Sequence, residues 1–281
     1  MKKILYFILI FLIIIFGILL YSRFFGTIGL KTKETMIYTN LTESYDGLKI
    51  IHFSDLHYKK IITEARVKEL IQAINKTKPD LVLFTGDLLD KDYQLKNTDI
   101  NFLIKELSQI KAKYGNYAIL GDQDYQEIEN IKNIYIQSNF TVLENEYTII
   151  HNENNDQIII GGISSYLKNK ANINEISQSL QNEDNSIYQI IMVHEPDYIP
   201  KIVENLPNTS MIVSGHSING SINIPIIKQL LLPTGAKNYY KPYYKINQTN
   251  IYISNGIGVN QINFRLFNTP SINFYRIKKS N

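Results

Sequence analysis

The stretch PDLVLFTGDLLD, at residues 79–90, contains the pattern that decides the fold. Within it, Leu81–Thr85 is a short apolar run that follows the helix-stopping pair Lys78-Pro79 and ends at Gly86-Asp87. A short apolar run bounded by turn residues is typical of a strand that is buried on both faces, as in a parallel sheet. The acidic residue Asp87 is therefore expected at the carboxyl end of a buried strand.

Four other apolar runs also end in polar, metal-binding residue types. The five stretches are, in chain order, Asp55-Leu56-His57, Gly86-Asp87, Gly121-Asp122-Gln123-Asp124, Val193-His194 and Gly215-His216-Ser217. The chain has only five histidines, and three of them lie in these stretches. Because open α/β sheets bind ligands at strand ends, and because carboxylates and imidazoles are metal ligands, the pattern predicts a metal site.

Helical and strand patterns alternate through the first half of the chain. After Thr63, a helix is predicted by apolar residues spaced i, i+3, i+4 and i+7, namely Val67, Leu70, Ile71 and Ile74. A second such set is Ile100, Leu103, Ile104 and Leu107. The later half is richer in strands, expected at Gln157–Gly161, Tyr188–Val193, Ser210–Ser214, Ile251–Ser254 and Ile272–Ile277. Alternation of this kind indicates a layered α/β domain.

Composition narrows the possible chemistry. The 281 residues contain no cysteine, which excludes thiolate metal sites, cysteine nucleophiles and disulfides. The formal net charge of +3 is too small to indicate nucleic-acid binding. We predict an N-terminal membrane anchor over residues 1–23, a connector with a first extended segment over 24–46, and one folded domain over 47–281.

The N-terminus predicts one transmembrane helix. Ile4–Tyr21 is apolar and uncharged, lies between Lys2-Lys3 and Arg23, and is long enough to cross a bilayer. A cleaved signal peptide is the alternative, but the flank after Tyr21 is a poor cleavage site. The nearest charges favour an inside N-terminus, which predicts a single-pass cell-membrane protein with an extracytoplasmic domain.

The five stretches, in this order, resemble the calcineurin-like metallophosphoesterases, particularly their membrane-associated bacterial branch. The resemblance extends from about Leu48 to Ile277 and includes IIHFSDLHY, PDLVLFTGDLLD, GNYAILGDQDY, IMVHEPDYI, MIVSGHSINGS and IYISNGIGV. It implies a four-layer α/β/β/α sandwich and one or two divalent ions (manganese, iron or zinc) that activate a water molecule to attack phosphorus.

The resemblance also assigns roles to single residues. It implies that Asp55 and His57 hold one ion together with Asp87. The second ion would be held by the bridging Asp87 and by Asp122, His194 and His216. The catalytic set would be Asp87, Gln123 and Asp124, with Asp124 orienting its loop rather than binding metal.

Three positions depart from the family pattern. Asp122 replaces an asparagine, and its carboxylate still provides a ligand. Gln123 replaces a histidine that would assist the leaving group, and the loss of general-acid help costs roughly 10²- to 10⁴-fold in rate. Ile218 replaces the last histidine of Gly-His-x-His, so the first ion loses a protein ligand, for which Asn219 is a weak oxygen substitute.

We therefore predict a membrane-anchored phosphoester hydrolase of the phosphodiesterase or pyrophosphatase type, with lipid-linked or nucleotide-linked substrates. The alternative is a catalytically impaired relative that binds a phosphorylated ligand or a partner. A third interpretation is a purely structural domain, in which the acidic and histidine side chains would point away from one another.

Overall fold

Two six-stranded sheets form the centre of the domain. The computed structural model describes residues 2–91, 93–259 and 263–280. The first sheet has the order β1 (Lys31–Thr39), β12 (Ser271–Lys279), β2 (Leu48–Phe53), β3 (Leu81–Phe84), β4 (Asn116–Ala118) and β5 (Phe140–Val142). The second has the order β10 (Tyr243–Ile246), β11 (Thr249–Ile253), β9 (Met211–Ser214), β8 (Tyr188–Val193), β7 (Gln157–Ile163) and β6 (Glu146–His151).

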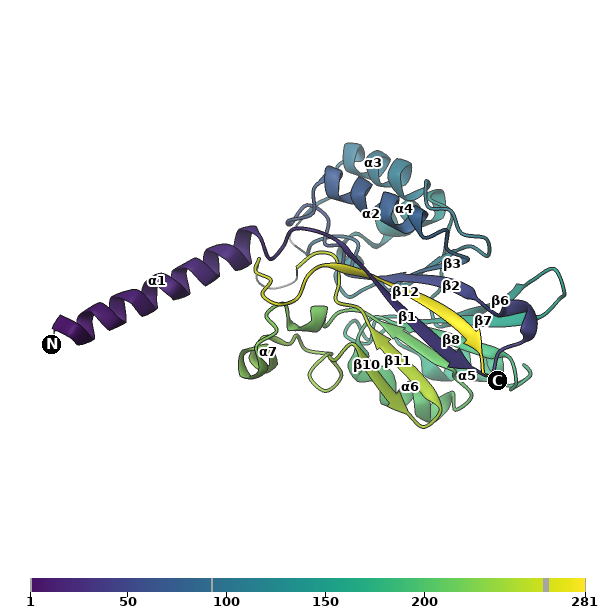
Figure 1. Ribbon diagram of the computed structural model, residues 1–281. Coiled ribbons are helices and arrows are strands. Elements are labelled where there is room, and N and C mark those ends of the chain that lie inside the picture. The colour runs from purple at the N-terminus through teal and green to yellow at the C-terminus, as the bar shows by residue number, and fades with distance from the viewer. Residues whose placement is uncertain (1, 92, 260–262, 281) are drawn as a thin grey trace.

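Helices cover the outer face of each sheet (Figure 1). The first sheet carries α2 (Glu64–Lys76), α3 (Asn97–Leu107) and α4 (Ile128–Gln137), and the second carries α5 (Ile173–Leu180) and α6 (Ile199–Asn205). The short helix α7 (Pro225–Leu231) and the 3₁₀ turns η1 (Glu43–Tyr45), η2 (Asp124–Glu127), η3 (Pro196–Tyr198) and η4 (Ile218–Gly220) lie in the connections. The predicted four-layer α/β/β/α sandwich is confirmed.

Side chains of the strands alternate between two cores because a strand has a period of two. In β8, Ile190 and Met192 pack between the sheets, whereas Ile191 and Val193 pack against α5 and α6. All six residues of β8 are buried, including the polar Gln189, and the other five are apolar or aromatic. The strand ends of both sheets are thereby fixed by packing on two sides.

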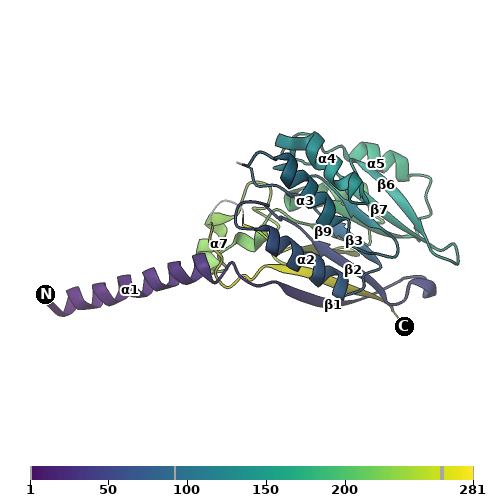
Figure 2. The same cartoon turned by 90° about the horizontal axis from the view of Figure 1, so that it is seen from above.

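The predicted helix after Thr63 is α2, and all four residues of its apolar set are buried. The segment assigned to a connector contains β1, which pairs in parallel with β12 along its whole length. Before it, α1 (Lys2–Phe24) extends from the domain, has a mean hydropathy of 3.1 over its most apolar 18 residues, and is a candidate membrane span (Figure 2).

Candidate metal centre

The predicted ligands all lie in turns at the carboxyl ends of strands. Asp55 and His57 follow β2, Asp87 follows β3, and Asp122 follows β4 in the first sheet. His194 follows β8 and His216 follows β9 in the second sheet. The two sheets therefore supply one cluster in common, in which the ligand atoms form two groups that share Asp87. This convergence excludes the interpretation that the side chains point apart.

Left-handed backbone turns aim several of these side chains. Asp55, His57, Asp87 and His216 have φ values of 54°, 46°, 59° and 62°. Such a conformation costs a non-glycine residue on the order of 1 kcal/mol or more and is concentrated at functional sites. These residues lie two to four positions after the ends of β2, β3 and β9, where the left-handed turns redirect the chain.

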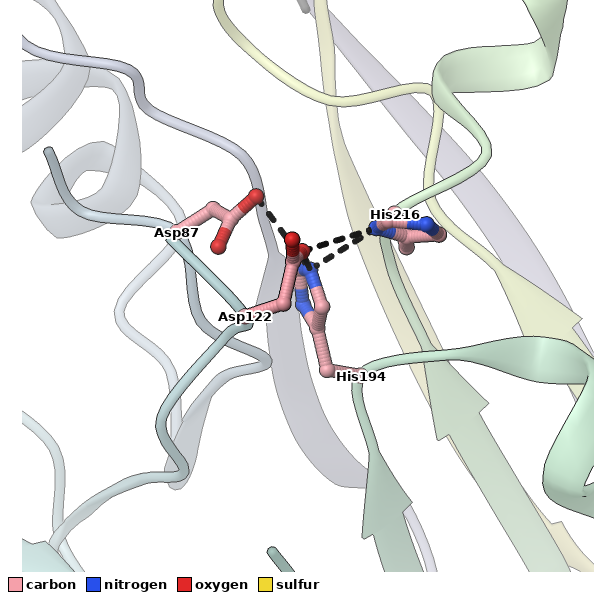
Figure 3. Close-up of side chains that lie close together, drawn as sticks. All are labelled: Asp87, Asp122, His194 and His216. Carbon is pink, nitrogen blue, oxygen red and sulfur yellow. Dashed lines mark hydrogen bonds and ion pairs between the residues drawn. The ribbon is translucent and has the colours of Figure 1, made fainter. Parts of the chain in front are cut away.

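The group around Asp122 is the more compact of the two (Figure 3). Nε2 of His194 lies 3.3 Å from Oδ2 of Asp87 and 3.4 Å from Oδ1 of Asp122. Nδ1 of His216 lies 3.2 Å from the same Asp122 oxygen. These four side chains converge on one point with two oxygens and two nitrogens, a donor set suited to a divalent transition metal.

Backbone carbonyls orient both of these imidazoles. Nδ1 of His194 donates to the carbonyl of Thr85 at 2.6 Å, and Nε2 of His216 donates to that of Thr234 at 2.7 Å. In each ring the other nitrogen faces the cluster, and these two nitrogens lie 3.2 Å apart. Hydrogen bonds of this kind set the tautomer and ring orientation of metal-binding histidines.

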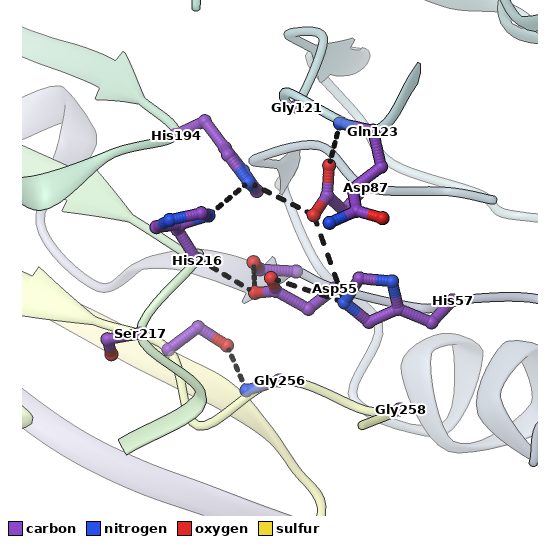
Figure 4. A network of polar contacts seen from close by, with 12 residues as sticks. Asp55, His57, Asp87, Gly121, Gln123, His194, His216, Ser217, Gly256 and Gly258 are labelled. Atoms are coloured by element: carbon purple, nitrogen blue, oxygen red, sulfur yellow. Dashed lines mark hydrogen bonds and ion pairs between the residues drawn. The ribbon is translucent and has the colours of Figure 1, made fainter. Parts of the chain in front are cut away.

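The second group consists of Asp55, His57 and the shared Asp87 (Figure 4). Nε2 of His57 lies 3.8 Å from Oδ1 of Asp55 and 3.8 Å from Oδ2 of Asp87. The other oxygen of each carboxylate already accepts a hydrogen bond. Oδ2 of Asp55 accepts from the backbone N–H of His216, and Oδ1 of Asp87 accepts from the backbone N–H of Gln123. One oxygen of Asp55 and one oxygen of Asp87 therefore remain free to bind a metal ion.

The free atoms of the cluster are buried polar atoms without hydrogen-bond partners. They include Oδ1 of Asp55, Nε2 of His57, Oδ2 of Asp87 and Oδ1 of Asp122. A buried polar atom without a partner is costly, and several at one point indicate a missing common partner. A cation fits this place, because each atom presents a lone pair or a negative charge to it.

The pKa shifts of the clustered side chains also favour a bound cation. Burial raises the pKa of Asp87 to about 8, and the charge of Asp122 adds to this effect. Burial also lowers the pKa of His57 to about 4, which keeps its imidazole neutral, as a ligand must be. Burial opposes the charged form of His194 too, but Asp87 and Asp122 outweigh it and raise its pKa well above the ordinary value. The cluster thus needs positive charge.

Asp124 connects the two loops that carry Asp87 and Asp122. Its Oδ2 accepts from the amides of Asp87 and Gly121, each at 2.9 Å, and its Oδ1 from that of Leu88 at 2.8 Å. The side chain is buried and is not among the grouped ligands. Burial raises the pKa of Asp124 to about 6.

Close contact of these loops requires glycine at position 121. A Cβ atom there would lie 2.1 Å from Oδ1 of Asp87 and 2.4 Å from its backbone nitrogen. No such approach is tolerated by real side chains, so Gly121 sets how near the Asp122 turn comes to Asp87.

The departures from the family pattern occupy different places. Gln123 is half-buried and its side chain points toward the cluster from beside Asp87 (Figure 4). Ile218 is buried, and its neighbour Asn219 directs its side-chain oxygen to Nζ of Lys228. Asn219 therefore does not replace the missing ligand, and among the described residues the acidic and histidine side chains grouped around Asp55 number three.

Arg265 was not anticipated from the sequence. Its guanidinium is fully buried and donates to the carbonyls of Asn255 at 2.9 Å, Gly256 at 3.1 Å and Asn268 at 3.2 Å. Burial lowers its pKa to about 9, while the negative charge of Asp55 opposes that shift. Its partners are backbone carbonyls brought together only by folding, so no local sequence pattern marks it.

Comparison with known proteins agrees with this geometry. The chain is 27% identical to a metallophosphoesterase of Bacillus subtilis, YkuE, over 93% of this chain and 90% of that protein. It is also 27% identical to a second one, YkoQ, over 93% and 97%. A transmembrane protein with a metallophosphoesterase domain from Bos taurus is 23% identical over 85% of this chain and 54% of that protein. The calcineurin-like phosphoesterase family model matches residues 48–219, and the chain belongs to this family.

Proposed function

We propose that this protein is a metal-dependent phosphoester hydrolase of the phosphodiesterase or pyrophosphatase type, anchored in the cell membrane by α1. The observation that carries the proposal is the sharing of Asp87 between two groups of buried ligand atoms. A carboxylate shared in this way is what a two-metal phosphoester site requires. Asp55 and His57 would hold one ion with Asp87, and Asp122, His194 and His216 would hold the other.

Bound divalent ions would lower the pKa of a water molecule and neutralise charge on the phosphoryl oxygens. The protein side chains position the other components. Gln123 points toward the cluster, and its amide can donate a hydrogen bond to a phosphoryl oxygen. It cannot give a proton to the leaving group, so hydrolysis should depend strongly on how good the leaving group is. Asp124 would contribute by holding the loops of Asp87 and Asp122 together.

The donor set suits manganese, iron or zinc, because it combines oxygen and imidazole ligands without sulfur. The group around Asp122 has four protein ligands and should fill first. The group around Asp55 has three, and Ile218 provides none, so it should bind its ion more weakly.

The test is hydrolysis of bis(4-nitrophenyl) phosphate by the full chain in detergent with added Mn²⁺. We expect slow, metal-dependent hydrolysis that is abolished in Asp87→Ala and unchanged in the matched control Asp184→Ala, which alters an exposed turn before β8. Between one and two ions per chain should be bound. Hydrolysis that survives in Asp87→Ala would refute the assignment of the site.

A second candidate function is motivated by Gln123 and Ile218. A protein that lacks both the leaving-group histidine and a metal ligand could bind a phosphorylated ligand or a partner without turnover. The double variant Gln123→His/Ile218→His separates the two functions. A hydrolase impaired only at these positions should gain rate, most with poor leaving groups. An increase in phosphate affinity with no turnover at any metal concentration would favour the binding protein.

The side of the membrane can be tested because the chain contains no cysteine. We propose an extracytoplasmic domain. A single cysteine introduced as Lys111→Cys should then react with a membrane-impermeant maleimide in intact cells. Protection in intact cells and reaction only after lysis would place the domain in the cytoplasm.

A further inference from the structure

The end of α1 is joined firmly to the domain. Ser22 is buried, whereas residues 3–21 are exposed, and the Ser22 carbonyl accepts a hydrogen bond from the backbone amide of Arg265 at 3.0 Å. Gly26 packs so closely that a Cβ atom would lie 1.8 Å from the Arg265 carbonyl oxygen. Helix and domain therefore meet in a defined contact rather than through a free tether.

Arg265 links this contact to the metal centre. Its guanidinium donates to the carbonyls of Asn255, Gly256 and Gly258. The amide of Gly258 in turn donates to the carbonyl of Asp55 at 2.7 Å. The Arg265 side chain and the Gly258 backbone thus connect the end of the helix to the turn that carries Asp55 and His57.

Strand register places the metal centre at the end of the molecule from which α1 leaves. β1 begins at Lys31, soon after α1, opposite Ser271 at the start of β12. β12 runs antiparallel to β2 and pairs Asn273 with His52. Asp55 lies just beyond His52, so the carboxyl ends of the strands face the end from which α1 leaves (Figures 1 and 2).

Exposed apolar side chains gather at this end, and we call them the membrane-end patch. They come from the helix end, from α7 and from the loop after Arg265, and they are Phe24, Phe25, Ile28, Leu230 and Phe267, each more than half exposed. Leu266 ties two of these segments together, since its amide donates to the carbonyl of Ser221 and its carbonyl accepts from Asn223. Together with the bond from the Arg265 amide to the Ser22 carbonyl, these hydrogen bonds connect the three segments that carry the patch.

The helix α1 indicates that a lipid bilayer covers the membrane-end patch. A 23-residue apolar helix that is not buried by the protein has the length to cross a bilayer, and its last turn marks where the bilayer ends. Aromatic and basic side chains at such a boundary, here Tyr21, Phe24 and Arg23, are typical of the membrane interface. A water-soluble partner would not explain why the segments that carry the patch are hydrogen-bonded to the end of the span.

We infer that the membrane-end patch rests in the bilayer surface and that the metal centre acts on the phosphoester of a membrane lipid. This deepens the proposed function and rests on it. In the reaction, the oxygen of water bonds to phosphorus, the bond from phosphorus to the leaving oxygen breaks, and that oxygen takes up a proton. The acyl chains remain in the bilayer, so only the head group has to reach the ions.

The test uses the full chain in phosphatidylcholine vesicles with Mn²⁺ and two matched pairs of substrates. One pair is phosphatidylglycerol and glycerophosphoglycerol, and the other is cytidine diphosphate diacylglycerol and cytidine diphosphate glycerol. Each pair has the same phosphoester and differs only in the acyl chains. We expect the acylated member of at least one pair to react at least about tenfold faster at equal bulk concentration, because it is concentrated at the surface.

The variant Leu230→Asp/Phe267→Asp should lower the ratio of lipid hydrolysis to aryl phosphodiester hydrolysis by about tenfold or more, since each buried apolar side chain contributes about that factor. Ile136→Asp is the matched control, because Ile136 is equally exposed but lies near the end of α4, just before β5 begins. It should leave the ratio unchanged.

Two results would overturn the inference in different ways. Metal-dependent hydrolysis of the aryl ester with no preference for either acylated substrate would refute the lipid assignment and leave the proposed function standing. A metal-loaded preparation inactive on every substrate would refute both.

Discussion

The substitution Asp124→Asn tests whether the loops of Asp87 and Asp122 depend on one carboxylate. The two oxygens of Asp124 accept from the amides of Asp87, Gly121, Leu88 and, at 3.4 Å, Leu89. Asparagine keeps the shape but presents an NH₂ group in place of one oxygen. In either orientation two backbone amides lose their acceptor and face another donor.

The cost follows from the hydrogen bonds that are lost. A hydrogen bond to a charged group contributes about 1.5–3 kcal/mol, so two of them amount to roughly 3–6 kcal/mol before compensation. Burial opposes the charged form of Asp124, as its raised pKa shows, and removal of that charge returns part of the loss. We expect the free energy of unfolding to fall by about 3 kcal/mol. Metal affinity should fall about 10- to 100-fold because the ligands lose their orientation.

Asp197→Asn is the matched control. Asp197 also accepts from three backbone amides, those of Lys237, Asn238 and Tyr239, but it lies outside both ligand groups. Urea unfolding with chelator and calorimetric titration with Mn²⁺ should show both variants destabilised and only Asp124→Asn impaired in metal binding. Equal metal affinity in Asp124→Asn and in the unsubstituted protein would refute the orienting role.

Two further predictions concern Gly121 and His52. Gly121→Ala should reduce metal-dependent hydrolysis to the level of Asp87→Ala, because the new methyl group overlaps Asp87. The control Gly17→Ala should leave the rate unchanged, because nothing lies within 4 Å of a Cβ atom there. An active Gly121→Ala variant would contradict the contact between Gly121 and Asp87. Burial lowers the pKa of His52 to about 3, so below pH 6.5 the unfolded chain binds a proton that the folded chain refuses. The free energy of unfolding should therefore fall by up to about 1.4 kcal/mol per pH unit from this residue as the pH drops from 6.5 toward 3, and His52→Gln should remove that slope. Parallel stability curves would refute the assignment.

Much of the fold could be predicted wherever one local pattern controlled one element. The apolar spacing after Thr63 identified α2, and the largely apolar run Tyr188–Val193 identified β8 to the residue. The strand ends also located the ligand turns, because a polar residue directly after a buried strand has few other places to lie. Asp87 and His194 follow strands of different sheets, so their proximity depends on how the two sheets pack and not on the edge of a single sheet.

Other elements depend on partners distant in the chain. β1 is an edge strand whose partner β12 begins at Ser271, so the segment from Lys31 to Thr39 gives little local indication that it belongs to the first sheet. Helix α4 was missed although Ile131, Ile134 and Tyr135 are buried, because its short apolar set follows directly on the η2 turn. The alternation alone indicated a layered α/β domain, and the four layers came from the resemblance.

The departures at the metal centre show most clearly what sequence cannot supply. Asn219 was a candidate oxygen ligand by position, yet its side-chain oxygen accepts a hydrogen bond from Nζ of Lys228. The outcome depends on where α7 lies, and no pattern near Asn219 reveals this. The same holds for Arg265, because the backbone carbonyls that accept its hydrogen bonds are brought together only by the tertiary structure.

The reduced ligand group still favours a bound cation. Asp55 and His57 adopt left-handed backbone conformations and bury a carboxylate oxygen and an imidazole nitrogen without hydrogen-bond partners. Each feature costs free energy, on the order of 1 kcal/mol or more. Replacement of a ligand by Ile218 does not relieve either cost. A chain that had abandoned this site could lower both by ordinary substitutions, so the arrangement is best explained if an ion bound beside Asp87 offsets the cost when the protein folds.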